Sequence, residues 1–203
     1  MPAPMTKISW CDYTWNPWMG CKRVSPGCDN CYADRDMTRY GRDFDTVTRS
    51  KTQFDKPLKL KEPSLIFTCS WSDFFIHEAD GWREEAWEII KATPQHTYQI
   101  LTKRPGLAVQ WAKDHGWPDN AWLGVTVESQ KYAPRIDVAM RIRQYTPGAL
   151  IFVSYEPALG PVDFGHWVSE SSCIQKIFHL RSECQRGIQW VIAGGESGPN
   201  VRQ

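Results

Sequence analysis

The sequence predicts a single α/β domain built around a parallel sheet of six strands, either open or closed into a barrel. Three observations support this: short runs that are almost continuously apolar, intervening segments with apolar residues at helical spacing, and a polar cluster at the end of each run. Strands buried on both faces are apolar at nearly every position, as in parallel sheets covered by helices. The 203 residues, 41% of them hydrophobic, suffice for one such core.

The strands are predicted from runs rich in β-branched and aromatic residues. The first lies around residues 7–15, just before a group of cysteines. No internal repeat or linker interrupts the chain, so the domain is expected to span residues 1–203. The five later strands are predicted at 64–73 (SLIFTCSWSD), 97–105 (TYQILTKRP), 121–129 (AWLGVTVES), 149–157 (ALIFVSYEP) and 188–198 (IQWVIAGGESG).

Three helices are predicted between these strands, at 80–93, 104–116 and 134–144. In the first, Trp82, Ala86, Ile89 and Ile90 share one face, as helical spacing requires. The alternation of strand and helix with short links favours right-handed βαβ units. The remaining long segments, 41–63 and about 160–187, are interpreted as surface excursions, and the second holds Cys173 and Cys184, which match no ligand pattern.

Composition narrows the functional classes. The net charge of +1 gives no global field that would favour nucleic acid or a membrane. No signal peptide and no run long enough to span a bilayer is found, so we expect a cytoplasmic protein with reduced thiols. Seven cysteines, some clustered, then indicate metal binding rather than a disulfide framework.

The cysteine loop, residues 20–33 (GCKRVSPGCDNCYA), carries Cys21, Cys28 and Cys31 with the spacing C-x6-C-x2-C. One interpretation is a zinc clip whose fourth ligand is Cys11 or a histidine. The other is a [4Fe–4S] cluster held by three thiolates, which leaves one iron open for a ligand. Thiols that bind no metal are the third alternative.

Polar side chains follow five consecutive predicted strands. Because the carboxyl ends of parallel strands meet at one edge, we expect these groups to surround one cavity mouth and to bind a cofactor or substrate. Lys103 and Arg104 are suited to pairing with a carboxylate or phosphate, and buried glutamates should have partners. The candidate binding residues are Ser70, Asp73, Thr102, Lys103, Glu128, Ser154, Glu156 and Glu196.

The loop's CxxC-aromatic end (Cys28, Cys31, Tyr32), which follows a first strand and precedes βα units, resembles the radical S-adenosylmethionine (SAM) superfamily. This resemblance implies a partial, TIM-barrel-like (β/α) barrel of six strands. It also implies a [4Fe–4S] cluster on the three cysteines and SAM at the open iron. Reductive cleavage of SAM would yield a 5′-deoxyadenosyl radical that abstracts hydrogen from a substrate.

Two features depart from that superfamily's pattern. The first cysteine gap is six residues where three are usual, and the Gly-Gly-Glu motif, Gly194–Glu196, ends the sixth predicted strand instead of the second. The superfamily's amino-group role is therefore not transferred to Glu196. Ser70 or Asp73 occupies the corresponding place at the end of the second strand.

The whole chain more narrowly resembles a phage- and bacterium-associated family of unknown function with this three-cysteine loop. The resemblance rests on WNPWMGCKRVSPGCDNCYA, FTCSWSDFF, ILTKRP, VSYEPALG and AGGESGPNVRQ. Members continue past this point, and no helix follows the sixth predicted strand here. We therefore expect a longer natural protein, which an intact-mass measurement would test.

The preferred function is a radical-SAM-like iron–sulfur enzyme with an unknown substrate and an electron-donor protein as a possible partner. The alternative is a zinc-clipped or metal-free α/β interaction module of phage or defence origin, without catalysis. Nucleic acid is a possible substrate, because Lys22 to Lys61 carries ten Lys/Arg against six Asp. No membrane partner is expected.

Overall fold

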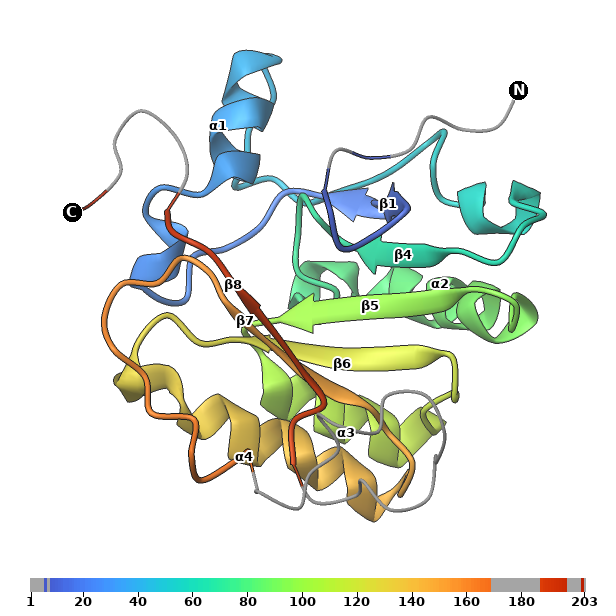
Figure 1. Ribbon diagram of the computed structural model, residues 1–203. Helices are drawn as coiled ribbons and strands as arrows, with labels where there is room; N and C mark the ends of the chain where they lie inside the picture. The colour runs from blue at the N-terminus through green and yellow to red at the C-terminus, as the bar shows by residue number, and fades with distance from the viewer. Residues whose placement is uncertain (1–5, 7, 169–186, 197–201, 203) are drawn as a thin grey trace.

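A computed structural model of the chain describes residues 6, 8–168, 187–196 and 202. Its centre is a six-stranded parallel sheet in the order β1-β4-β5-β6-β7-β8, which confirms the predicted strands and their alternation with helices (Figure 1). Among the described residues β1 and β8 do not pair with each other, so this sheet is open. The strands are β1 Tyr13–Trp15, β4 Leu65–Thr68, β5 Thr97–Thr102, β6 Ala121–Thr126, β7 Ile151–Tyr155 and β8 Trp190–Ala193.

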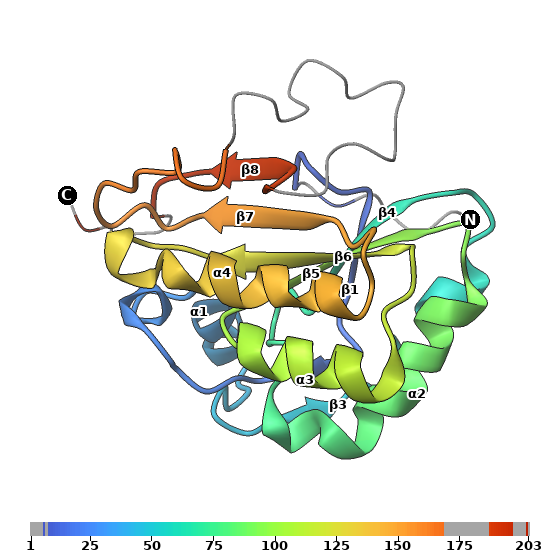
Figure 2. The same ribbon diagram turned by 90° about the horizontal axis from the view of Figure 1, so that it is seen from below.

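The three predicted helices are confirmed as α2 (Asp80–Ala92), α3 (Pro105–His115) and α4 (Pro134–Met140), with a 3-10 turn at Arg141–Gln144 after α4. They lie together on one face of the sheet (Figure 2). Proline at the first position of α3 and α4 fits because that residue needs no intrahelical N–H bond. Parallel strands joined by these helices place all the carboxyl ends at one edge.

The main core lies between the sheet and these helices. Alternate strand residues such as Ile100, Leu123 and Val153 point toward the helices and are fully buried. Burying a side chain of this size contributes about 1.5–3 kcal/mol. The parallel register of neighbouring strands therefore rests on a continuous apolar layer, which holds the strand ends in fixed positions.

The other face of the sheet carries aromatic side chains near the amino ends of the strands. Trp10 packs against Phe67 and Trp190, with ring centroids 4.6 and 6.1 Å apart. Trp122 and Phe152 pack on Trp190 as well, at 6.2 and 5.7 Å. These rings fill this face at one end and leave the carboxyl end of the strands for a cavity.

Several elements were not predicted. Helix α1 (Tyr32–Arg39) follows the third cysteine, and β2 (Trp18–Met19) pairs with β3 (Thr48–Arg49) in a small antiparallel sheet. Helix α1 projects from the body of the molecule above the sheet (Figure 1). Strands of two residues have no hydrophobic periodicity to detect.

The interpretation of residues 41–63 as a surface excursion is wrong in part. Phe44 and Phe54 are buried, with 6% and 5% of their surface exposed. The indole N–H of Trp15 donates to the carbonyls of Gln53 and Phe54, both at 3.0 Å. A buried indole needs such an acceptor, so this segment is anchored to the end of β1.

Some predictions concern residues that the structure does not describe. Cys173 and Cys184, most of the excursion at 160–187, and residues 197–201 lie outside the described residues. Within the described part of the chain, no helix combines the length and apolar character needed to cross a bilayer.

Candidate functional site

A cavity of about 680 Å³ lies at the carboxyl edge of the sheet. The cysteine loop, helix α1 and the carboxyl ends of β4, β5, β6, β7 and β8 line it. All the predicted site residues except Glu128 are among its lining residues: Cys21, Cys28, Cys31, Ser70, Asp73, Thr102, Lys103, Ser154, Glu156 and Glu196. The expectation that polar strand ends gather around one cavity is thus met for groups at the ends of β4, β5, β7 and β8, and Thr126 adds a hydroxyl from β6.

The cysteine loop crosses the strand ends and is fastened to four of them. Near β4, the Tyr32 hydroxyl donates to the Ser70 carbonyl at 2.7 Å. Near β5, Arg104 Nη2 donates to the Lys22 carbonyl at 2.9 Å. The remaining two attachments, to Glu128 after β6 and Glu196 after β8, are described below. The loop is therefore built into the carboxyl edge of the sheet.

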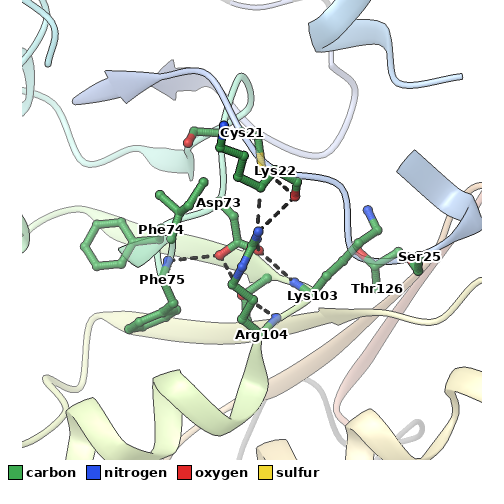
Figure 3. A network of polar contacts seen from close by, with 12 residues as sticks. Cys21, Lys22, Ser25, Asp73, Phe74, Phe75, Lys103, Arg104 and Thr126 are labelled. Carbon is green, nitrogen blue, oxygen red and sulfur yellow. Dashed lines mark hydrogen bonds and ion pairs between the residues drawn. The ribbon is translucent and has the colours of Figure 1, made fainter. Parts of the chain in front are cut away.

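Asp73 lines the cavity, and its side chain is 7% exposed (Figure 3). One oxygen accepts from the Thr102 hydroxyl at 2.7 Å and from the Phe75 N–H at 2.9 Å. The other accepts from the Lys103 N–H at 3.0 Å and pairs with Arg104 Nη1 at 2.9 Å. Four donors hold a buried charge without an unpaired lone pair facing the core. Arg104, not Lys103, is the residue that pairs with a carboxylate here.

The same guanidinium reaches the first cysteine of the loop. Arg104 Nη1 lies 4.0 Å from Cys21 Sγ, a weak sulfur hydrogen bond (Figure 3). Burial raises the pKa of the Cys21 thiol to about 11 and Asp73 adds to the rise, while Arg104 opposes it. A metal bound at Cys21 would therefore displace a proton from a thiol that is neutral at pH 7.

Glu128 lies beneath the cysteine loop and is fully buried. Its carboxylate pairs with Arg135 Nη1 at 2.7 Å and accepts a hydrogen bond from the Ser25 hydroxyl. A Cβ on Gly27 would meet Glu128 Oε1 at 2.5 Å, so only glycine fits there without a shift. Glu128 is not among the residues that line the cavity, and the contacts of its carboxylate are to Ser25 of the loop and to Arg135.

Glu196 ties the end of β8 to the same loop, and its side chain is 5% exposed. It accepts from Asn30 Nδ2 at 3.0 Å and from the Arg202 N–H at 2.8 Å. Arg202 also donates to the Pro26 carbonyl at 2.8 Å and pairs with Asp29 at 3.1 Å. Chiefly through hydrogen bonds from Arg202, the pKa of Glu196 falls from 4.5 to about 2.

Glu156, at the end of β7, differs from these three. It lines the cavity and has no hydrogen bond or ion pair to any residue that the structure describes. Desolvation raises the pKa of its carboxyl above 4.5. The nearly buried hydroxyls of Thr126 and Ser154 line the same cavity from neighbouring strands. This side of the cavity offers polar groups that a ligand could still engage.

The three thiols of the cysteine loop differ from the usual single-ion site. Within the described residues, no group of three His, Cys, Asp or Glu side chains converges on one point. Cys11 is 7% exposed and does not line the cavity, nor does any described histidine, so neither expected fourth zinc ligand lies there. Three thiols of one loop are the donor type that holds an iron–sulfur cluster, in which each thiolate binds a separate iron and need not converge with the others on one point.

Sequence reasoning missed the residues that fasten the loop: Ser25, Asn30, Tyr32, Arg135 and Arg202. Most of these contacts join distant positions, such as Asn30 and Glu196, which are 166 positions apart, although Arg135 and Glu128 are only seven apart. No local spacing encodes the distant contacts. The only available signal was the general expectation that buried glutamates have partners, which Arg135 meets for Glu128.

Comparison with known proteins identifies a family without an assigned activity. A family model described as a protein of unknown function (DUF5131) matches residues 5–203. No curated protein and no solved structure matches the chain. Nothing in these comparisons links it to the radical SAM superfamily or to phage.

Proposed function

The chain belongs to the DUF5131 family of unknown function, and we propose that it is an iron–sulfur enzyme of the radical-SAM type. One observation carries the proposal. Three thiols of a single loop line one cavity together with polar groups from five parallel strand ends. Ligand sites of parallel α/β folds lie at this edge of the sheet.

We propose further that the sheet is a partial (β/α) barrel. Six parallel strands with helices on one face, and an aromatic-filled opposite face that ends in a cavity, support this reading. In such an arrangement the partly exposed rings of Trp10, Trp122 and Trp190 would shield the cavity from water on the side of the strands' amino ends. A site that must keep water and oxygen from a reactive group needs such a wall.

In this proposal Cys21, Cys28 and Cys31 hold a [4Fe–4S] cluster. When bound, the cluster supplies an open iron for SAM and the electron that cleaves it. The chain's own residues bind and orient: Lys103 offers a cation, and Glu156 a carboxylate, neither paired with a charged side chain among the described residues. The Thr126 and Ser154 hydroxyls add donors that orient a bound ligand.

Anaerobic reconstitution of the full chain tests the proposal. We expect a brown protein that binds iron and sulfide, and that forms 5′-deoxyadenosine from SAM and a reductant. Cys28→Ser should lose iron, whereas Cys11→Ser, a matched change at a buried thiol away from the cavity, should retain it. Cluster-loaded protein that binds no SAM would refute the radical chemistry and leave only the metal site.

A metal-free or zinc-clipped interaction module is the second candidate. One observation favours it: protein contacts at Lys22, Ser25, Asn30 and Tyr32 hold the cysteine loop without any metal. Elemental analysis of protein purified without oxygen separates the two. About one zinc and no iron per chain, as a structural site requires, would favour the module.

Nucleic acid is the weaker substrate proposal. Several basic residues of the 22–61 stretch are paired with acids, as in Arg23–Asp34, Arg49–Glu85 and Lys59–Asp55. Paired cations release fewer counterions from phosphates. If the protein nonetheless bound DNA or RNA with an affinity that falls steeply as salt is added, nucleic acid would again be favoured as the substrate.

A further inference from the structure

Asp73 and Arg104 form a nearly buried ion pair in which further hydrogen bonds fix the carboxylate. The two side chains are 7% and 13% exposed, and 2.9 Å separates their charged atoms (Figure 3). Backbone N–H groups of Phe75 and Lys103 and the Thr102 hydroxyl occupy the remaining acceptor positions of Asp73. The carboxylate therefore cannot turn toward a ligand, and it fixes the guanidinium in one place.

The fixed guanidinium acts on one cysteine of the three. Arg104 Nη1 lies 4.0 Å from Cys21 Sγ, and Nη2 holds the Lys22 carbonyl next to it at 2.9 Å. Among the described residues, no hydrogen bond reaches the sulfur of Cys28 or Cys31. The loop thus presents one sulfur with a charged donor and two without.

A donor or positive charge at a ligating sulfur stabilises the reduced cluster, which carries one more negative charge. We propose that Arg104, held by Asp73, is a positioning residue that raises the reduction potential of the cluster through Cys21. Asp73 moderates the effect, because its negative charge opposes that of Arg104. This inference rests on the proposed cluster, to whose ligands these residues are adjacent.

Potentiometric titration of the reconstituted full chain tests it. Dithionite supplies the single electron that the oxidised cluster gains, and electron paramagnetic resonance reports the reduced form. Arg104→Met should shift the midpoint potential to a more negative value, since the donor and charge are lost. Asp73→Asn should shift it the opposite way, since the charge of Arg104 is no longer offset.

Lys103→Met is the matched control, because it removes an equal charge from the next residue without removing a bond to sulfur. Its shift should be smaller than that of Arg104→Met. Equal shifts in these two variants, or no shift in Arg104→Met, would overturn the role of the hydrogen bond.

If Arg104→Met fails to load iron, Arg104→Lys replaces it in the titration, because lysine retains the positive charge but lacks the planar guanidinium fork. Its potential should lie below that of the unchanged protein, and an unchanged potential would overturn the inference. If the unchanged chain itself binds no iron, both the proposed function and this inference fail. If the unchanged chain binds iron but substitution of Arg104 leaves the midpoint reduction potential the same, the inference alone fails.

Discussion

The acidic side chains at the carboxyl ends of the strands fall into two groups. Asp73, Glu128 and Glu196 are each bound by arginine and by at least one further donor of the protein. Glu156 faces the same cavity region without such a partner among the described residues. The position at a strand end is common to all four, so position alone does not define a ligand contact.

The number of protein donors distinguishes carboxylates that hold the structure together from one that is available to a ligand. A carboxylate that has accepted several protein donors is stable in a dry environment and has little left to offer a ligand. Glu156 instead retains the penalty of partial desolvation, which is why its pKa is raised. The first group holds the cysteine loop, and the second remains open to a ligand.

The largest expected effect comes from breaking a buried member of the first group. Glu128→Gln removes the charge that offsets Arg135, while keeping the side chain's shape. Leaving one partner of a buried pair uncompensated costs about 3–5 kcal/mol. Urea denaturation should show a loss of this size in the free energy of unfolding.

The double variant Glu128→Gln/Arg135→Met is its control. Removing both charges together should cost less than the sum of the two single changes, because no buried charge is left alone. Additive losses would mean that the pair does not act as a unit and that Glu128 belongs with Glu156.

A smaller loss is expected from crowding the loop against the same carboxylate. In Gly27→Ala, the new Cβ would meet Glu128 Cγ and Oε1 at 2.5 Å. Overpacking of this kind costs about 1–3 kcal/mol, and here it would also displace the loop. We expect Gly27→Ala to bind less iron after reconstitution and to have a lower free energy of unfolding in urea denaturation.

Gly81→Ala in α2 is the matched control, because its Cβ would meet nothing within 4 Å. Alanine in a helix is favoured over glycine by about 0.5–1 kcal/mol, so this variant should be neutral or slightly stabilised. A Gly27→Ala protein as stable as Gly81→Ala would show that Glu128 and the loop are not in firm contact.

Periodicity and strand-end position allowed much of this architecture to be predicted. The five later strands and the three helices are long enough for apolar spacing to indicate them, and parallel geometry alone brings Cys21 and Glu156 to one cavity. Helix α1 was missed because its buried residues are only Ala33 and Met37. Helix α4 is one residue shorter, but its apolar spacing continues into the 3-10 turn that follows, where Ile142 is buried.

The division among the acids could not be predicted. It depends on which donors lie within hydrogen-bond distance in space, and Ser25 and Glu128 are 103 positions apart. Sequence reasoning therefore assigned Glu128 and Glu156 the same role. Burial and partners, which only the fold supplies, give them different roles.

Acid should weaken the Glu196 attachment by a still smaller amount. Because the pKa of Glu196 falls from 4.5 to about 2 in the folded protein, its stabilisation is full above pH 4.5 and is lost as the pH falls toward 2. Comparison of the unchanged chain with Glu196→Gln should show a difference in unfolding free energy that disappears over this window.

Glu85→Gln serves as the control, since Glu85 also has a lowered pKa but pairs with Arg49 away from the loop. It should reproduce some pH dependence without altering iron retention, whereas Glu196→Gln should reduce retention at neutral pH. Identical retention in both variants would remove Glu196 from the group that holds the loop.

The smallest expected change in stability tests the second group. The pKa of Glu156 is raised, so its ionised form is disfavoured in the folded protein and its cost disappears as the pH falls through that raised pKa. Glu156→Gln should therefore raise the thermal midpoint slightly at pH 7, with no gain in acid, while weakening SAM binding by the reconstituted protein. Calorimetry measures both effects. Because Glu196→Gln is expected to change stability in the opposite direction, a loss of stability in Glu156→Gln would mean that Glu156 is bound within the protein like the other three acids.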